Sequence, residues 1–178
     1  MGLVQLSTRP GIAEVTLVPG KVNALNEQTV QELGGCFENL TEQSQVNAII
    51  LAGQGTKFFS FGFDIPEFLS YSKEAFAKYL EKFTGFYTYL FTYPNPLVAA
   101  LNGHNIAGGC MLALACDYRR KATGSNVRYA TKLIGYLWTS PPRRIRVIKS
   151  GQCNGPRQTW SVDLSWFAPG AKIQIRTE

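Results

Sequence analysis

The residues best suited to chemistry lie in one stretch, Leu97–Asp117, where an apolar run meets a glycine-rich turn. Leu97–Leu101 is short, continuous and apolar and follows Pro96, which predicts a buried strand. After Asn102-Gly103, the sequence Ala107-Gly108-Gly109 opens an Ala- and Leu-rich run that predicts a buried helix. A strand that enters a helix through glycines leaves the first-turn N–H groups pointing outward without backbone partners. The stretch therefore predicts a main-chain site for an anion or an oxyanion.

Gly108 and Gly109 also have a simpler interpretation, because small residues permit close helix packing, and their spacing is not that of nucleotide-binding loops. Two further stretches lie upstream, Asn23-Ala24-Leu25-Asn26 and Lys57–Phe68, the latter reading KFFSFGFDIPEF. In this order and at these separations, the three stretches resemble the enoyl-CoA hydratase/isomerase (crotonase) family over about residues 1–119. The Phe-rich stretch and Met111 are closer to the enoyl-CoA isomerases of that family than to its hydratases.

The resemblance implies an α/β fold, a crotonase-like spiral of β-β-α units, here truncated or altered on its C-terminal side. It implies proton transfer on fatty acyl-CoA thioesters, as in β-oxidation, with coenzyme A as part of the substrate and no separate cofactor or metal. The backbone N–H groups of Phe63 and Gly108 would stabilise the thioester oxyanion. The positions that would contact substrate or coenzyme A are Lys21, Ala24, Ser60, Phe61, Gly62, Asp64 and Ile65. Family members also form homo-oligomers.

Several of these residues have structural alternatives. Phe63 is also a natural core aromatic, which does not conflict with its role because the proposed donor is the backbone. Lys21 is also a typical solvated surface lysine. Phe68 and the aromatic face of residues 73–93 either line an acyl channel or form ordinary core.

A catalytic base is harder to find. Hydratases of this family use two glutamates, and Met111 stands where the first would be. Isomerases use the second alone to carry a proton between two carbons of the substrate, but residues 118–162 contain no Asp or Glu and Asp163 is too remote to assign. Glu67 is expected on a solvated face.

Three other polar residues near these stretches are expected to have structural roles. Asp64 is expected to cap or brace its loop. His104, the only histidine, is of a residue type often used as a general acid or base, but its place in an Asn-Gly-His turn favours a structural role. Asp117 is expected to lie at a helix end or in a turn.

Alternation of strands and helices around these stretches predicts the α/β class. A hairpin is expected from residues 4–8 and 12–18, around Arg9-Pro10-Gly11. Helices are expected over residues 27–43, capped by Asn26, and 72–93, ended by Pro94 and Pro96. Buried or extended strands are expected over residues 46–52 and 58–60.

The composition fits one domain of 178 residues, with no apolar run of about 18 residues that would span a membrane. The first residues lack the basic and apolar regions of a secretory signal. The four cysteines show no metal-binding spacing. A cytoplasmic location is the simplest expectation.

Charge divides the chain near Arg119. Residues 1–118 hold six Lys or Arg and ten Asp or Glu, a net charge of −4. Residues 119–178 hold twelve Lys or Arg and two Asp or Glu, a net charge of +10. We therefore predict a family-like core over 1–119 and a basic segment over 120–178 that does not match the family. Our hypothesis is that the residues from about 120 onward come from another reading frame or exon than the family's.

Two other functions stay open. One is a catalytically inactive acyl-CoA-binding protein, or a truncated product without a stable fold. The other is binding of nucleic acid or an anionic membrane through basic residues with nearby Tyr and Trp. These basic residues are Arg119, Arg120, Arg143, Arg144 and Arg146. The second alternative is the weaker one, because no known nucleic-acid module is present and a chance of composition explains the basic residues more simply. We therefore expect no nucleic-acid partner, and no membrane span because no apolar run is long enough.

Overall fold

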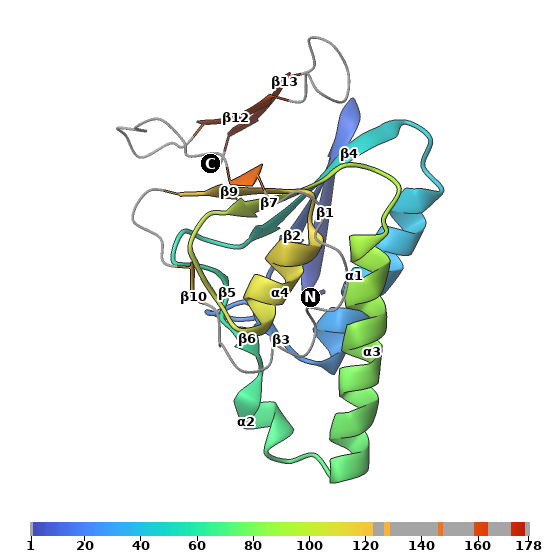
Figure 1. Ribbon diagram of the computed structural model, residues 1–178, viewed down its shortest axis with the longest axis vertical. Coiled ribbons are helices and arrows are strands. Elements are labelled where there is room, and N and C mark those ends of the chain that lie inside the picture. The colour runs from blue at the N-terminus through green and yellow to red at the C-terminus, as the bar shows by residue number, and fades with distance from the viewer. Residues whose placement is uncertain (1, 123–126, 129–145, 148–158, 164–171, 177–178) are drawn as a thin grey trace.

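The computed structural model describes residues 2–122, 127–128, 146–147, 159–163 and 172–176. Its main sheet has the strand order β1-β2-β4-β7-β9-β11 (Figure 1). These strands are β1 (Val4–Arg9), β2 (Gly11–Leu17), β4 (Val46–Gly53), β7 (Leu97–Leu101), β9 (Tyr118–Lys121) and β11 (Arg146–Val147). β1 and β2 form the predicted antiparallel hairpin, and the neighbours from β2 onward are parallel.

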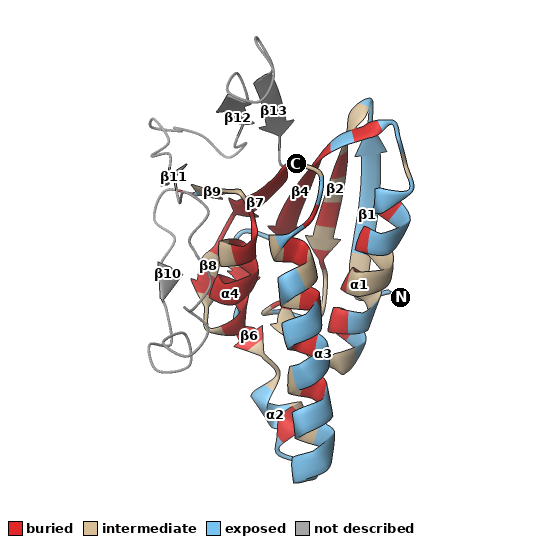
Figure 2. Cartoon of the chain, turned by 45° about the vertical axis from the view of Figure 1, so that its right-hand side comes forward, coloured by how far each residue is buried: buried red, intermediate tan, exposed pale blue. Residues whose placement is uncertain are grey.

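Helices cover one face of the main sheet, as Figure 2 shows. They are α1 (Glu27–Thr41), α3 (Lys73–Phe91) and α4 (Gly108–Ala115), and the short α2 (Ile65–Phe68) precedes α3. Side chains alternate along β4, so Ile49 and Leu51 join the large core beneath the helices while Ile50 joins a smaller cluster on the opposite face. The large core therefore lies between the sheet and the helices and buries Phe37 and Phe83.

Short strands build a second layer. The sheet β10-β8-β5 is parallel and comprises β5 (Phe58–Ser60), β8 (His104–Ile106) and β10 (Val127–Arg128). β4 and β7 are neighbours in the main sheet, and β5 and β8, which follow them in the chain, are neighbours in this one. Each strand-strand-helix unit therefore adds one strand to the main sheet and one to the second sheet, beside the strands of the preceding unit. This arrangement confirms the predicted spiral. β12 (Thr159–Asp163) and β13 (Lys172–Arg176) form a separate antiparallel pair.

Side chains cap the two long helices, at Asn26 as predicted and at Ser72, where the second predicted helix begins. The Asn26 side chain accepts a hydrogen bond of 2.9 Å from the Thr29 N–H at the start of α1. The Ser72 hydroxyl accepts one of 3.2 Å from the Ala75 N–H at the start of α3. Each cap satisfies an N–H that has no partner within its helix. Both predicted helices are confirmed, with ends that agree within about two residues.

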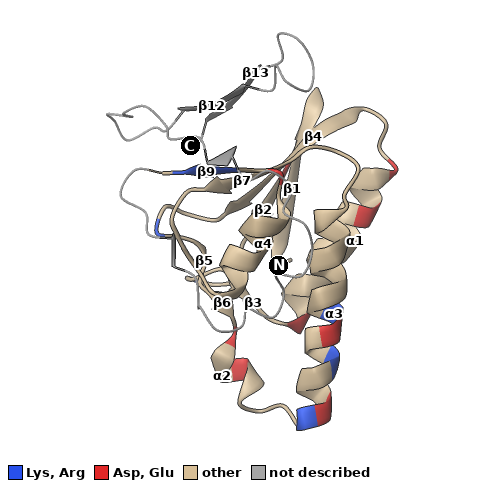
Figure 3. Cartoon of the chain, viewed as in Figure 1, with Lys and Arg blue, Asp and Glu red and all other residues tan. Residues whose placement is uncertain are grey.

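Charged residues lie on α1, α2, α3 and β9, whereas β4 and β7 carry none (Figure 3). Within the described residues, no helix combines the length and the apolar character that crossing a membrane requires.

Arg119 of β9 is buried, which is unusual for a charged residue. Its Nη1 donates hydrogen bonds to the carbonyl oxygens of Ala113, at 2.9 Å, and Cys116. A cation is stabilised there by the negative end of the α4 dipole. Arg119 therefore does not contribute to an exposed basic surface, which is one of the alternatives that the sequence leaves open. Of the other arginines named for that surface, Arg143 and Arg144 lie outside the described residues.

Candidate functional site

The candidate site lies where two short strands meet the N-terminus of α4. β3 (Ala24–Leu25) pairs in parallel with β6 (Gly62–Phe63), so that Ala24 is opposite Gly62 and Leu25 is opposite Phe63. Segments from two of the three sequence stretches are therefore side by side. The third stretch supplies α4, which contacts β6, β5 and β8.

Glycines allow the backbones of β6 and α4 to approach closely. A Cβ atom on Gly62 would lie 2.8 Å from the amide nitrogen of Gly108, and one on Gly108 would lie 2.8 Å from the Phe63 ring. Real Cβ atoms do not approach other atoms so closely, so any larger residue at either position would push β6 and α4 apart. The structure thus brings together the residues of both predicted N–H donors.

The peptide groups fix the direction of each donor. The Asp64 N–H donates a 3.2 Å hydrogen bond to the Leu25 carbonyl. Because successive N–H groups of an extended chain point to opposite sides, the Phe63 N–H is directed away from β3. Gly108 is the first residue of α4, a position whose N–H has no acceptor within its own helix.

The Phe63 ring packs into the core while its backbone serves β6. Its centroid lies 4.8 Å from that of Phe83 and 5.6 Å from that of Tyr79, both in edge-to-face geometry. Both predicted uses of Phe63 are therefore compatible in the structure. Phe68 is also buried against Tyr79, at 4.4 Å between centroids, so it belongs to the same aromatic core.

Asn23 and Ser60 brace the turn before β6. The buried Ser60 hydroxyl donates to the Asn23 carbonyl at 2.7 Å and accepts from the Gly62 N–H at 3.1 Å. The Asn23 side chain donates to the carbonyl of Phe58 at 2.9 Å and to that of Gln54 at 3.2 Å. Sequence reasoning gave Asn23 no role of its own. Its φ is 51°, a conformation that asparagine tolerates better than most residues. The residue type, an asparagine just after a loop, was therefore the signal in the sequence.

Most of the other positions predicted to contact coenzyme A lie at or near the surface around this turn. Lys21 is exposed, two residues before the buried Asn23. Phe61 and Ile65 are large apolar residues that are 46% and 56% exposed. Ala24 and Asp64 are half-buried, whereas Ser60 is fully buried, so neither its side chain nor its backbone reaches the surface.

Two carboxylates follow Phe63. Asp64 caps α2 by accepting a 3.3 Å hydrogen bond from the Glu67 N–H, as predicted. Glu67 is half-buried and accepts from the Asn26 side chain at 2.8 Å and from the Tyr71 hydroxyl at 2.6 Å. The prediction that Glu67 lies on a solvated face is therefore wrong, because one carboxylate oxygen bonds to the N-cap of α1 and the other to Tyr71, just beyond α2.

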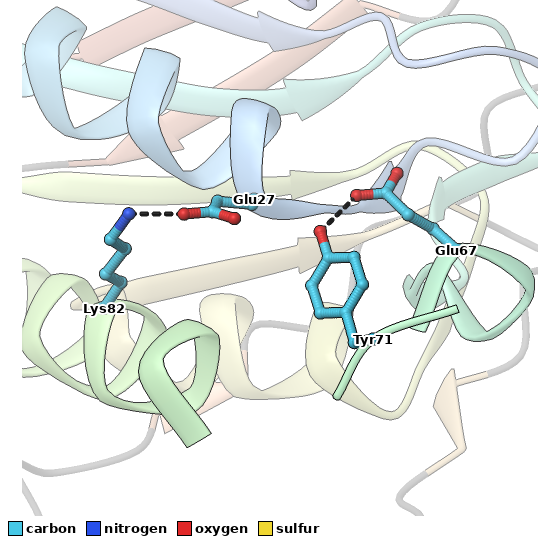
Figure 4. Close-up of polar contacts among 4 residues, drawn as sticks. All are labelled: Glu27, Glu67, Tyr71 and Lys82. Carbon is cyan, nitrogen blue, oxygen red and sulfur yellow. Dashed lines mark hydrogen bonds and ion pairs between the residues drawn. The ribbon is translucent and has the colours of Figure 1, made fainter. Parts of the chain in front are cut away.

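The hydrogen bond from the Tyr71 hydroxyl to the Glu67 carboxylate is drawn in Figure 4. This hydrogen bond raises the pKa of Tyr71 to about 12, because the hydroxyl must keep its proton to donate, and the nearby negative charge adds to the effect. Close by, Lys82 of α3 and Glu27 of α1 form an exposed ion pair. The ion pair joins α3 to α1, whereas Glu67 reaches the start of α1 through Asn26.

The remaining polar candidates have structural roles, as expected. The backbone N–H of His104 donates to the Lys57 carbonyl at 2.8 Å, and the His104 ring lies edge-on to Phe58. The Asp117 carboxylate accepts a 2.9 Å hydrogen bond from the Leu97 N–H and so ties the end of α4 to the start of β7. Met111 is buried in α4. Among the described residues, no three His, Cys, Asp or Glu side chains form a group that would bind a metal ion.

Comparisons with known proteins place this geometry in context. Residues 7–140 match the enoyl-CoA hydratase/isomerase family. The chain is 32% identical to mouse mitochondrial enoyl-CoA delta isomerase 1 over 131 residues, which are 74% of this chain and 45% of the mouse protein. It is 32% identical to a probable enoyl-CoA hydratase of Bacillus subtilis (strain 168) over 184 residues, covering 97% of this chain and 70% of that protein.

Solved structures agree with these sequence matches. The human mitochondrial delta3-delta2-enoyl-CoA isomerase superposes with a TM-score of 0.64 at 30% identity, over 66% of this chain and 46% of the human one. An enoyl-CoA hydratase/carnithine racemase from Magnetospirillum magneticum superposes with a TM-score of 0.69 at 31% identity, over 75% of this chain and 51% of that one. The chain thus spans about half the length of these structures and of the mouse isomerase. The predicted domain boundary near residue 119 stays a prediction.

Proposed function

The chain belongs to the enoyl-CoA hydratase/isomerase (crotonase) family, and on this premise we propose that it binds fatty acyl-CoA thioesters and stabilises their enolate. In this proposal the N–H groups of Phe63 and Gly108 donate to the thioester oxygen. Each donor of this kind is worth about 3–4 kcal/mol in comparable oxyanion sites, because it is fixed in place before charge develops.

The observation that carries the proposal is the close approach of Gly62 to Gly108. A Cβ on Gly62 would lie 2.8 Å from the Gly108 nitrogen, so the donor residues are neighbours in space although they are remote in sequence. A single oxygen between them would accept from both. Glycine at 62 and 108 keeps the two backbones this close, because a Cβ on either residue would force them apart.

Coenzyme A would lie along the turn that precedes α2. The exposed ammonium of Lys21 suits the phosphates of coenzyme A. The exposed ring of Phe61 and the exposed side chain of Ile65 offer apolar surface to the adenine. These assignments rest on family position, and the exposure of the three residues is consistent with them.

The proposed reaction is a shift of the substrate double bond, in which one carboxylate carries a proton between two carbons. Addition of water by a glutamate pair is less favourable, because the buried Met111 occupies the position of the first glutamate. Asp64 and Glu67, the carboxylates nearest Phe63 in the sequence, are engaged in hydrogen bonds at the start of α2 and α1. That engagement favours a second candidate, an acyl-CoA-binding protein without turnover. A cytoplasmic role in fatty acid metabolism is part of the same proposal.

Calorimetric titration with butyryl-CoA, alongside an assay of double-bond shift in a 3-enoyl-CoA, separates the candidates. Binding with turnover supports the isomerase, and binding without turnover supports the inactive binding protein. Equal affinity for butyryl-CoA and for coenzyme A without an acyl group would contradict a site built around the thioester carbonyl. The absence of binding by a cooperatively folded chain would reject both.

A further inference from the structure

Ala107, which links β8 to α4, has a backbone conformation that is unusual for a residue with a side chain. Its φ is 48° and its ψ is −117°. These angles are those of the first central residue of a type II′ turn, where glycine is preferred because a Cβ crowds the backbone. Among the described residues, the only other non-glycine with positive φ is Asn23. Such strain persists only where the surrounding structure enforces it.

The conformation of Ala107 determines where the Gly108 N–H points. The Ala107 carbonyl accepts a 3.2 Å hydrogen bond from the Met111 N–H, the first bond of α4. In a trans peptide the C=O and the following N–H point in opposite directions. The Gly108 N–H is therefore directed out of the N-terminal end of the helix. Rotating Ala107 to a negative φ would turn this peptide group and redirect both its oxygen and its N–H.

Neighbouring backbones enforce the conformation from two sides. A Cβ on Gly62 would lie 3.0 Å from the Ala107 methyl carbon, so that methyl group is packed close to β6. A Cβ on Gly109 would lie 2.6 Å from the Asn105 side-chain oxygen and 2.7 Å from the Ser60 carbonyl oxygen. β8 itself is fixed between β5 and β10. The turn has little room to relax.

We propose that Ala107 is a positioning residue, whose positive φ aims the Gly108 N–H at the thioester oxygen. This inference rests on the proposed function. It requires a residue at position 107 that tolerates positive φ, so glycine is accepted there and a β-branched residue is not. A role in packing would give the opposite order, because glycine would remove the methyl contact.

The test compares Ala107→Gly and Ala107→Val. The control is Ala115→Val, which adds the same volume at the buried far end of α4. The probe is acetoacetyl-CoA, because its enolate absorbs in the near ultraviolet and the absorbance reports stabilisation of the oxyanion. Coenzyme A without an acyl group reports binding that does not involve the carbonyl.

We expect the wild-type chain, Ala107→Gly and Ala115→Val to raise the enolate fraction of the bound probe at fixed pH. Ala107→Val should retain its affinity for coenzyme A while its enolate gain falls at least about tenfold, since loss of one donor in comparable sites costs about 10²–10³-fold in rate. Urea denaturation should give Ala107→Gly at least the stability of the wild type. If Ala107→Val does not fold, Ala107→Ser replaces it, with a smaller loss of enolate.

Loss of the enolate signal in Ala107→Gly, or its full retention in folded Ala107→Val, would overturn the inference. A lower stability of Ala107→Gly than of the wild type would also count against it, because the methyl group would then be needed for packing. If the wild-type chain itself produces no enolate gain, the proposed function is wrong and the inference falls with it.

Discussion

The Tyr79 hydroxyl of α3 donates a hydrogen bond of 3.0 Å to the Leu25 carbonyl of β3, and both residues are buried. The same carbonyl accepts from the Asp64 N–H. One oxygen of β3 therefore joins the long helix to the end of β6, next to the candidate donor Phe63. Burial raises the pKa of Tyr79 above its ordinary value, which keeps the hydroxyl protonated as a donor.

Tyr79→Phe should lower the free energy of unfolding by about 0.5–1.5 kcal/mol, because a buried hydrogen bond is lost while the ring contacts remain. Urea denaturation at neutral pH measures this difference. The carbonyl keeps one donor, Asp64, so a loss greater than about 3 kcal/mol would indicate that the hydroxyl supports more than this single bond.

Gly62→Ala should destabilise the fold by at least about 2 kcal/mol, because it adds a Cβ at a positive φ and against the Gly108 nitrogen. The matched control is Gly85→Ala in the exposed middle of α3, where an added Cβ meets nothing within 4 Å. That change should stabilise the fold by about 1 kcal/mol, because alanine is the better helix former. Equal effects of the two substitutions on thermal unfolding would contradict the packing described for β6 and α4.

Tyr71 should make the stability of the chain depend on pH in the alkaline range. Its pKa is raised from 10.0 to about 12 by the hydrogen bond to Glu67, so between these values the unfolded chain ionises while the folded chain stays protonated. The raised pKa therefore stabilises the fold below pH 10, and this contribution is lost as pH rises toward 12. Tyr71→Phe should show a weaker loss of stability over that range in urea denaturation.

Glu67→Gln provides the second half of this test. Removing the negative charge should lower the pKa of Tyr71 toward 10, and ultraviolet titration of the phenol groups, with Tyr71→Phe as the reference, measures the change. A Tyr71 titration that is the same in Glu67→Gln and in the wild-type chain would contradict the assigned contact.

Lys21→Glu should weaken binding of butyryl-CoA roughly 3- to 10-fold, the range expected for one exposed contact between a cation and a phosphate. The control is Lys78→Glu, which makes the same change of charge at an exposed position of α3. The difference between the two variants should shrink as salt is added, because ions screen exposed charges. An equal loss of affinity in both would assign the effect to net charge alone.

The sequence by itself determined the elements whose signals are local. Asn26 and Ser72 cap helices through contacts three residues away, and prolines follow α3, so the helix limits are encoded within a few residues. The apolar runs of β4 and β7 likewise predict buried strands. Three ordered stretches were enough to identify the family and the spiral of β-β-α units.

Tertiary structure decided what depends on residues that are remote in sequence. β3 and β6 are two-residue strands with no periodicity of their own, and they form because Leu25 and Phe63 are brought into register. Glu67 is engaged because Asn26, 41 positions earlier, reaches its carboxylate. The strained φ of Ala107 is set by packing against β6, which no local pattern of residues encodes. Local propensities act over one helical turn, whereas burial, register and backbone strain depend on which distant segments meet.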